Sequence, residues 1–438
     1  MSSLSRSEGA GNPLRSDFAS MDAAAHVEAK ARAAKEAAQV LALAPTRAKN
    51  EALAQMARGL EEKTAAILDA NRQDLERARA AGHPRAFVDR LTLTESRIEE
   101  MAVGLRHVAG LPDPVGETVE TWRRPSGLEI ARVRVPLGVI GFIYESRPNV
   151  TADAAGLCLK SGNAVLLRGG SEALDSNTML AQILARAVEK AGLPAEVIQA
   201  VETADRAAVL AMLTLDRYLD LIIPRGGEEF VRLVAERSTV PVLKHDKGLC
   251  HLYVDEGADL DMAVAVAVNA KAQRVSVCNA LETLLVHAAA APELLPRLAA
   301  RLAEAGVEVR ADERARALMP GAREAEPADW DTEYLDYILA VRVVESFDEA
   351  VAHIRRHGSG LAEAIVTRDV RRARRFTREV DAAAVLVNAS TRLVDGSQFG
   401  MGAEMGISTS RVHARGPVGV RELTTTKFVV WGDGHIRE

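Results

Sequence analysis

The chain begins with a helical pattern. From Met21 to about Ala44 the sequence is rich in Ala with interspersed Glu, Lys and Arg. Pro45 interrupts this pattern, and Thr46 is the predicted N-cap of a second helix. The apolar positions of the second pattern recur at helical spacing, at Leu53, Met56, Leu60 and Ile67. We therefore expect two or three long amphipathic helices at the start of the chain.

Alternating polar and apolar positions come next. Between Val119 and Pro136 they flank Pro125-Ser126-Gly127, a turn signal between two strands. A further apolar run, TTKFVVWG, spans Thr425 to Gly432 near the C-terminus. The first segment predicts a projecting hairpin, a device that often assembles oligomers.

Short β-rich runs then alternate with helical segments, a pattern that predicts βαβ units and parallel sheets. One set fills the first half of the chain and a second set follows from His251, so we expect two α/β lobes. An open parallel sheet places a ligand crevice at the carboxyl ends of its strands. The predicted strands are 138–144, 164–167, 197–201, 219–223, 251–254, 281–286 and 385–387.

Length and charge narrow the function classes. With 438 residues the chain is long enough for two or three lobes. Its 55 basic and 61 acidic residues argue against nucleic acid as a partner, and the basic run Arg371 to Phe376 fits a solvated helix face that begins near Asp369. No run of 18 apolar residues exists, so no membrane span is expected. The first twenty residues are polar and rich in Gly and Ser, which predicts a disordered tail (1–20) and not a signal peptide.

The cysteines point to a reducing, cytoplasmic compartment. Cys158, Cys250 and Cys278 are an odd number without a CxxC pair, which excludes a disulfide framework and a thiolate zinc site, and we expect no metal. Cys158 lies in an apolar helical run and Cys250 just before an apolar strand, both typical of buried thiols. Cys278 precedes the strand Leu281 to Val286, and a cysteine at a loop-to-strand junction can face a cleft and act as a nucleophile.

Glycine turns close two predicted strands of the first lobe. Arg168-Gly169-Gly170-Ser171 follows one strand and Arg225-Gly226-Gly227 follows another. Backbone N–H groups of such turns can approach a phosphate, and the arginines add positive charge. Glu333 is an acidic residue that could hold a ribose hydroxyl, and the glycine-rich segment 399–420 carries Arg415.

Together these stretches resemble the aldehyde dehydrogenase superfamily, and within it the branch that reduces acyl phosphates in proline synthesis. The resemblance implies an α/β, aldehyde-dehydrogenase-like fold with two doubly wound parallel-sheet lobes and an oligomerisation arm. It divides the chain into an NADPH-binding lobe (21–117 and 139–250), a catalytic lobe with Cys278 (251–395) and the arm (118–138 and 418–438). The stretches that carry it are 135–151, 161–173, 222–227, 277–287, and 399 to the end of the chain.

The same resemblance implies NADPH-dependent reduction of L-glutamyl 5-phosphate to L-glutamate 5-semialdehyde and phosphate, the second step of proline synthesis from glutamate. Cys278 would be the nucleophile, and Asn149, with Arg147 as its competitor, would stabilise the oxyanion. The branch also implies a homo-oligomer, a dimer or tetramer. Glutamate 5-kinase is a candidate partner, and the sequence leaves open whether the two enzymes dock. The implied cofactor-binding residues are Arg168, Gly169, Ser171, Arg225, Gly226, Gly227 and Glu333, and the candidates for substrate binding are Arg147, Lys244, His245, Arg274 and Arg415.

Two departures from related sequences matter. His245 stands where oxidising aldehyde dehydrogenases place a glutamate base, which disfavours an oxidising dehydrogenase, the alternative enzyme. The branch tends to carry Gly-Ser-x-His-Thr before an acidic residue, whereas this chain has Leu361-Ala362 before Glu363. An inactive binding paralogue is the alternative of another class, and the retained Cys278 argues against it.

Overall fold

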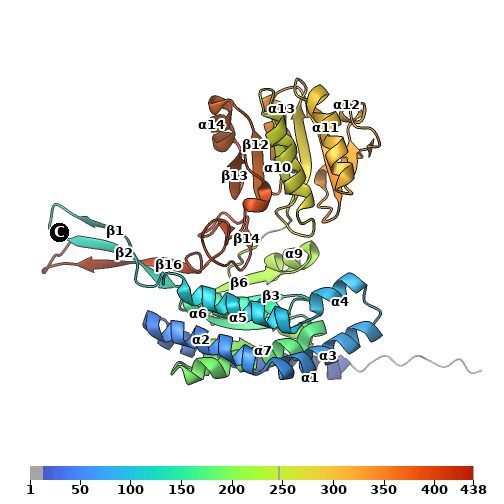
Figure 1. Ribbon diagram of the computed structural model, residues 1–438. Helices are drawn as coiled ribbons and strands as arrows, with labels where there is room; N and C mark the ends of the chain where they lie inside the picture. The colour runs from blue at the N-terminus through green and yellow to red at the C-terminus, as the bar shows by residue number, and fades with distance from the viewer. Residues whose placement is uncertain (1–12, 245–246, 438) are drawn as a thin grey trace, which may run out of the picture. The chain divides into compact units, whose positions relative to one another are not determined.

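The computed structural model describes residues 13–244 and 247–437, and its elements are labelled in Figure 1. The described residues form two compact units. Unit 1 comprises the chain up to residue 242 together with the residues from 423 onward, and unit 2 comprises residues 243–422. Within the described ranges, no helix has the length and apolar character needed to cross a bilayer.

Helices surround the sheet of unit 1. Helix α2 contacts α5 and α7, and α1 contacts β3 and β4 from a separate part of the chain. The helices of unit 1 are α1 (Pro13–Leu41), α2 (Thr46–Glu62), α3 (Thr64–Ala80), α4 (Arg85–Leu91), α5 (Glu95–Gly110), α6 (Asn149–Lys160), α7 (Leu174–Lys190), α8 (Arg206–Met212) and α9 (Glu228–Arg237), with the short 3-10 turns η1 (Ser171–Ala173) and η2 (Ala195–Val197).

Two predictions for the N-terminal segment are wrong. Residues 13–20, predicted as part of the tail, lie in α1. Extending a helix that has already formed costs less than nucleating one, and Pro13 suits the first position of a helix. Residues 1–12 lie outside the described residues. Thr46 is the first residue of α2 and not its N-cap, which is Pro45. The Thr46 hydroxyl instead donates to Asp113 Oδ2 at 2.8 Å.

The sheet of unit 1 is parallel, as predicted, with the order β5-β4-β3-β6. Strand β3 is buried along its whole length, which explains its continuous apolar run VIGFIY. Tyr144, at the carboxyl end of that strand, pairs in register with Gly169 on one side and Arg225 on the other. Both glycine turns therefore begin at the same edge. The strands are β3 (Val139–Tyr144), β4 (Ala164–Gly169), β5 (Ile198–Ala200) and β6 (Leu221–Arg225).

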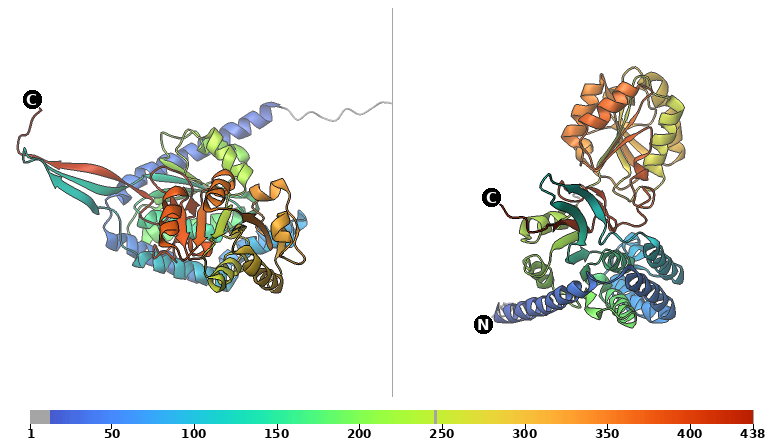
Figure 2. Two further views of the ribbon diagram at one scale, coloured as in Figure 1. Left: turned by 90° about the horizontal axis from the view of Figure 1, so that it is seen from above. Right: turned by 90° about the vertical axis from the view of Figure 1, so that its left-hand side faces the viewer.

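The predicted hairpin and C-terminal strand form one antiparallel sheet. Strands β1 (Thr118–Arg123) and β2 (Glu129–Pro136) turn at Gly127, whose φ of +94° suits glycine, and β16 (Thr424–Trp431) pairs with β2. Figure 2 shows these strands extending away from the rest of unit 1. Asn163 Nδ2 donates to Leu423 O at 2.8 Å and so anchors the start of β16.

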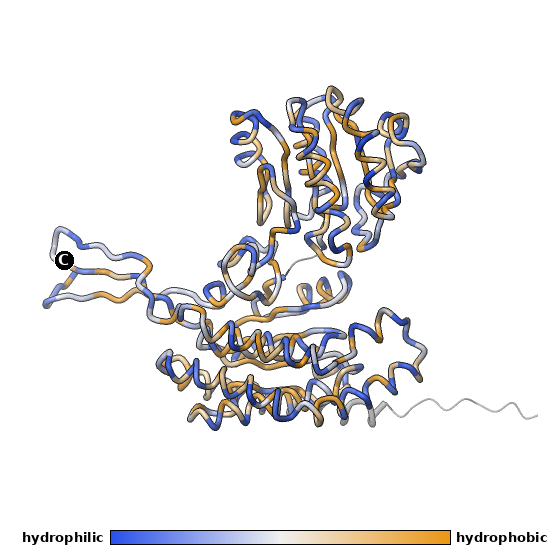
Figure 3. Tube along the Cα trace, viewed as in Figure 1, coloured by the Kyte–Doolittle hydropathy of each residue, from blue (hydrophilic) through white to orange (hydrophobic). Residues whose placement is uncertain are grey.

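Unit 2 is a doubly wound parallel sheet with the order β10-β9-β11-β8-β7-β12-β13. Leu252 and Val254 of β7 pack in the cluster that contains α10 and α11, whereas Tyr253 packs with α13 and α14. Alternate residues of one strand therefore face helices on opposite sides, and Figure 3 shows the apolar strands between them. The strands are β7 (Cys250–Val254), β8 (Leu281–His287), β9 (Glu308–Ala311), β10 (Arg323–Glu324), β11 (Ile338–Val344), β12 (Ala362–Val366) and β13 (Ala384–Val387).

Helices α13 and α14 of unit 2 have N-cap side chains, and α13 also has charged residues that complement the helix dipole. Helix α13 has Ser346 as its N-cap, acidic residues in its first turn and basic residues in its last turn. The Asp369 side chain caps α14, where the sequence predicted a helix to begin. The helices are α10 (Leu260–Ala272), α11 (Ala291–Glu304), α12 (Glu313–Arg316), α13 (Phe347–His357) and α14 (Val370–Glu379), with the turns η3 (Pro327–Asp331) and η4 (Thr391–Leu393) and the short pair β14 (Ile407–Ser408) and β15 (Gly416–Pro417).

The units divide at other positions than the sequence suggested. Unit 2 starts at residue 243, before the expected boundary at 250–251, and it extends to 422, past the expected end at 395. The reason lies in contacts that sequence periodicity does not reveal. Leu249 N donates to Ser359 Oγ at 3.0 Å, and Ile407 belongs to the main apolar cluster of unit 2.

Candidate active site

Cys278 lies in a turn between α10 and β8, at the amino edge of the sheet of unit 2. The turn is closed by a hydrogen bond from Ala280 N to Val277 O at 3.1 Å. The Cys278 side chain is partly exposed, whereas Cys158 and Cys250 are fully buried. Burial raises the pKa of the Cys158 thiol and raises that of Cys250 well above its usual range. Cys278 is therefore the accessible thiol, as the sequence predicted.

Gly248, in the segment that leads into β7, packs against the Cys278 turn. A Cβ atom on Gly248 would lie 2.0 Å from Cys278 O and 2.5 Å from Cys278 Cα. No side chain can occupy that space, so the chain before β7 packs directly on the main chain of Cys278. Cys250 adds a contact from the same segment, because its Sγ donates to Cys278 O at 3.3 Å.

Arg392, which the sequence reasoning missed, contacts both ends of the loop that carries Cys278. Its Nε donates to Gln273 Oε1 at 3.0 Å, and its Nη1 donates to Asn279 Oδ1. Asn279 is buried and donates through Nδ2 to Val394 O at 2.8 Å. The segment STRL gives no local signal for this role, because 113 positions separate Arg392 from Asn279.

A buried ion pair supports the segment that contains Glu333. Lys271 Nζ lies 2.7 Å from Glu282 Oε2, and both side chains are fully buried. Glu282 Oε1 accepts a hydrogen bond from Leu335 N at 3.3 Å, which connects the pair to the segment after η3. Burial raises the pKa of Glu282 to about 7, against the opposing effect of Lys271, and Glu333 raises it further. Glu333 itself is partly exposed.

The carboxyl edge of unit 1 brings the two predicted glycine turns together. Arg168 is buried at the end of β4 and donates from Nη1 to Gly169 O at 2.8 Å. Within the described residues, Arg168 Nε is buried without a hydrogen-bond partner. Burial lowers the pKa of Arg168; among neighbouring charges Glu172 raises it and Arg206 lowers it. Arg206, at the start of α8, is thus a second cation near this edge, and its place just after β5 is a signal that the sequence reasoning did not use.

The start of α9 already binds a carboxylate. Gly227 N donates to Glu145 Oε2 at 3.3 Å at the N-terminus of that helix. A Cβ on Gly226 would lie 2.7 Å from the same oxygen. Ser171 is exposed in η1, on the adjoining turn. The N-terminus of α9 therefore accepts negative charge, as an anion site would, and Gly227 leaves open space beside it.

The candidates for oxyanion stabilisation lie in unit 1. Asn149 is the first residue of α6, and its Nδ2 donates to Asp153 Oδ2 at 3.4 Å. Arg147 is exposed, and its carbonyl accepts from Val150 N at 3.1 Å at the start of the helix. Ser146 has a φ of 50°, which turns the chain between β3 and α6.

The remaining substrate-binding candidates lie in unit 2, apart from His245, which is outside the described residues. Lys244 is tied through its main chain, since Lys244 N donates to Ser410 Oγ at 3.3 Å. Arg274 is exposed in the Cys278 loop. Arg415 forms an ion pair with Asp381 at 2.6 Å and lines a cavity of about 540 Å³ with Ser359.

The altered segment at the start of β12 has a structural explanation. Leu361 and Ala362 are fully buried in the main apolar cluster of unit 2. Glu363 is also buried, and its Oε2 accepts hydrogen bonds from His251 N at 2.9 Å and pairs with His251 Nδ1 at 3.0 Å. The two apolar residues therefore extend the core next to this buried pair.

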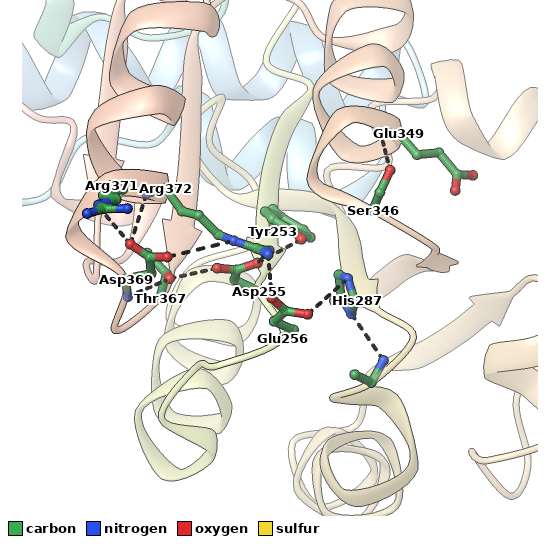
Figure 4. Close-up of polar contacts among 11 residues, drawn as sticks. Tyr253, Asp255, Glu256, His287, Ser346, Glu349, Thr367, Asp369, Arg371 and Arg372 are labelled. Carbon is green, nitrogen blue, oxygen red and sulfur yellow. Dashed lines mark hydrogen bonds and ion pairs between the residues drawn. The ribbon is translucent and has the colours of Figure 1, made fainter.

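The opposite, carboxyl edge of the sheet of unit 2 carries a polar network (Figure 4). Arg372 Nη1 donates to Asp255 Oδ1 at 2.6 Å, and Thr367 Oγ1 donates to Asp255 Oδ2 at 2.7 Å. Arg372 also contacts Glu256, which lies 3.8 Å from His287 Nε2. These groups pair with one another and join β7, β12 and α14. The network therefore explains part of the basic run as internal ion pairs.

Comparisons with known proteins decide the family. The aldehyde dehydrogenase family model matches residues 16–325 and 329–429. The gamma-glutamyl phosphate reductase of Moorella thermoacetica is 56% identical over 95% of this chain and 100% of its own length. That of Geobacter metallireducens is 53% identical over the same shares. The chain belongs to the aldehyde dehydrogenase family, in its gamma-glutamyl phosphate reductase branch.

A solved structure from this branch has the same fold as this chain. The gamma-glutamyl phosphate reductase of Thermotoga maritima is 51% identical, covers 94% of this chain and 100% of its own, and superposes with a TM-score of 0.93. The expected aldehyde dehydrogenase fold, with parallel sheets, is thereby confirmed. Membership of this family implies a nicotinamide cofactor, and the edge of unit 1 fits one. Within the described residues, Arg168 Nε there is a buried N–H without a hydrogen-bond partner, and Gly227, at the start of α9, has open space where a Cβ would lie.

Proposed function

We propose that this chain reduces L-glutamyl 5-phosphate to L-glutamate 5-semialdehyde and phosphate with NADPH, in the second step of proline synthesis from glutamate. The observation that carries the proposal is the accessible thiol of Cys278, in a turn fixed by Gly248 and Arg392, in a chain 56% identical to a gamma-glutamyl phosphate reductase over 95% of its length. The relatives' name supplies the substrate, and the site supplies the nucleophile that an acyl phosphate needs.

The first chemical step is attack by the Cys278 thiolate on the γ-carbonyl carbon. The sulfur–carbon bond forms, the carbon–oxygen bond to phosphate breaks, and phosphate departs with the bonding electron pair. The product is a thioester on Cys278. A thioester is reduced more readily than a carboxylate, which is why a covalent cysteine intermediate suits this reaction. A nicotinamide cofactor, when bound, would supply the hydride that takes the acyl group to the aldehyde level, and Cys278 would leave as the thiolate.

Oxyanion stabilisation accompanies both changes at the carbonyl carbon. We assign it to the backbone N–H of Cys278 and the side chain of Asn149, with Arg147 as the competitor. A single donor of this kind contributes about 3 kcal/mol in other acyl-transfer sites. His245 in place of a glutamate base leaves the chain without the group that activates water in oxidising relatives, so the thioester is protected from hydrolysis.

The residues proposed to hold the pyrophosphate and the 2′-phosphate lie at the carboxyl edge of the sheet of unit 1. Backbone N–H groups of Gly169, Gly226 and Gly227, with the adjoining Arg225, would hold the pyrophosphate, and Glu333 of unit 2 the nicotinamide ribose. Arg168, with Ser171 and the nearby Arg206, provides the positive charge and the hydroxyl that favour a 2′-phosphate. This arrangement is the basis for proposing NADPH and not NADH.

The antiparallel arm provides a surface for self-association. Phe428, Val430 and Trp431 are exposed on β16, and Trp122 of β1 packs edge-to-face against Phe428 at 6.1 Å between ring centroids. Exposed apolar residues gathered on a projecting sheet are typical of protein interfaces. We therefore propose a dimer or tetramer in the cytoplasm, and docking to glutamate 5-kinase as the source of the labile substrate.

A coupled assay tests the proposal. Glutamate, ATP and glutamate 5-kinase generate the acyl phosphate in place, and NADPH consumption is followed after addition of this chain. We expect consumption only when kinase and ATP are both present, no turnover with Cys278→Ala, and full turnover with Cys158→Ala if that variant folds. Consumption by Cys278→Ala at the normal rate would contradict the assigned nucleophile.

A further inference from the structure

The guanidinium of Arg392 is held in a fixed position beside the nucleophile. Gln273 ends α10 as its C-cap residue, and Asn279 directly follows Cys278, so the two hydrogen bonds of Arg392 reach the beginning and the end of one loop. Arginine has five N–H donors in a planar fork. The two contacts use Nε and Nη1, and among residues 13–244 and 247–437 Nη2 has no hydrogen-bond partner.

A second cation lies at the same place. Arg274 follows Gln273 and is exposed. Burial lowers the pKa of Arg392 and the charge of Arg274 lowers it further, whereas Asp395 and the Cys278 thiolate act in the opposite direction. Arg392, Arg274 and Cys278 are therefore close enough to interact electrostatically. The two positive charges repel each other, and an anion bound between them would relieve this repulsion.

We propose that Arg392 and Arg274 form an anion subsite beside Cys278 that takes the phosphate group of the acyl phosphate. The inference rests on the proposed function and deepens it by naming the groups that receive the leaving phosphate. Attack by Cys278 Sγ transfers the bonding electrons to the phosphate oxygen, and Nη2 of Arg392 donates a hydrogen bond to the phosphate without giving up a proton. Gln273 and Asn279 fix the guanidinium before substrate arrives.

The place of the subsite favours phosphate over the other anion of the substrate. The phosphate oxygen is bonded to the carbon that Sγ attacks, so phosphate must lie next to Cys278. The α-carboxylate is several bonds farther along the chain. A cation that shares a loop with the nucleophile is therefore suited to the leaving group, and Arg415, paired with Asp381, remains a candidate for the carboxylate.

Alkylation of Cys278 tests the subsite without cofactor or turnover. Rates with anionic iodoacetate and neutral iodoacetamide are compared for the full chain, for Arg392→Gln, for Arg392→Lys and for the control Arg368→Gln. Arg368 is an arginine of unit 2 whose side chain is 71% exposed and pairs with Asp259. We expect iodoacetate to be favoured, inorganic phosphate to protect, and both effects to fall about tenfold in Arg392→Gln, the weight of one hydrogen bond to a charged group. Arg392→Lys should recover part of both effects, and the control should match the unaltered chain.

Steady-state kinetics separate phosphate from carboxylate. In the reverse reaction, Arg392→Gln should raise the KM for inorganic phosphate about tenfold and leave the KM for the semialdehyde nearly unchanged. A rise in the semialdehyde KM alone would assign Arg392 to the carboxylate and overturn the proposal. If Arg392→Gln lowered the rates of alkylation by iodoacetate and iodoacetamide equally and phosphate still protected Cys278, Arg392 would have only a structural role and the proposal would be overturned. The alkylation results stand even if the chain fails to reduce an acyl phosphate, so the two failures are distinguishable.

Discussion

The thiol of Cys250 donates a hydrogen bond to the carbonyl oxygen of Cys278 at 3.3 Å. Two cysteines of opposite character thus lie in contact. Cys250 is fully buried and its pKa is raised well above the usual range, first by burial and then by Glu363, whereas Cys278 is partly exposed. The first residue of β7 supports the turn of the nucleophile and takes no part in the chemistry.

Alkylation should distinguish the thiols of the native chain. Brief treatment with iodoacetamide is expected to modify Cys278 and to leave Cys250 and Cys158 unmodified, because only a thiolate within reach of the reagent reacts. Peptide mass spectrometry after denaturation and labelling with a second reagent measures each site. Modification of Cys250 at a rate similar to that of Cys278 would contradict the assignment.

Gly248→Ala should disable the Cys278 turn. The added Cβ would fall within 2.5 Å of the Cys278 main chain, so the turn or the strand before it must shift. We expect a loss of kcat of about 100-fold, of the size caused by small misplacements of reacting groups. The matched control is Gly257→Ala in the same unit, where an added Cβ meets nothing within 4 Å. Equal activity of both variants would show that the close approach is not required.

The Lys271–Glu282 pair should behave as a buried ion pair. Lys271→Met leaves Glu282 buried and unpaired and is expected to cost about 3–5 kcal/mol of unfolding free energy, whereas the double variant Lys271→Met with Glu282→Leu should recover much of that loss. Glu282 accepts the hydrogen bond from Leu335 N. The single variant removes the ion-pair partner of this acceptor and the double variant removes the acceptor itself, so both variants should disturb the Glu333 segment and raise the KM for NADPH. Urea unfolding and cofactor titration measure the two effects. A double variant no more stable than the single variant would contradict the pairing.

Arg168 and Arg206 should determine cofactor preference. Removing either positive charge is expected to raise the KM for NADPH about tenfold and to change the KM for NADH little, because only NADPH carries the 2′-phosphate. Arg206→Gln is the cleaner variant, since Arg206 is exposed and Arg168 is buried. Parallel titrations with both cofactors make the comparison. A proportional rise in both KM values would place these arginines at the pyrophosphate instead.

The sequence predicted those parts of the fold and site that depend on local pattern. The apolar run of β3, the turn at Gly127 and the loop-to-strand position of Cys278 all follow from neighbouring residues. Thr46 was misassigned because a hydroxyl that could cap a helix instead reaches Asp113, far along the chain. Arg392 and Gly248 were missed for the same reason, since their roles arise only when β7, β8 and η4 come together. The true limits of unit 2 likewise depend on contacts such as Leu249 with Ser359.

The central claim is that the acyl group is transferred between phosphate and the sulfur of Cys278. The reverse reaction tests this claim most directly. Purified chain is given L-glutamate 5-semialdehyde and NADP⁺, with and without inorganic phosphate, and NADPH formation is followed for the unaltered chain and for Cys278→Ala. We predict turnover that requires phosphate and is absent in Cys278→Ala. Turnover of the same rate without phosphate would show an oxidising aldehyde dehydrogenase and contradict the account.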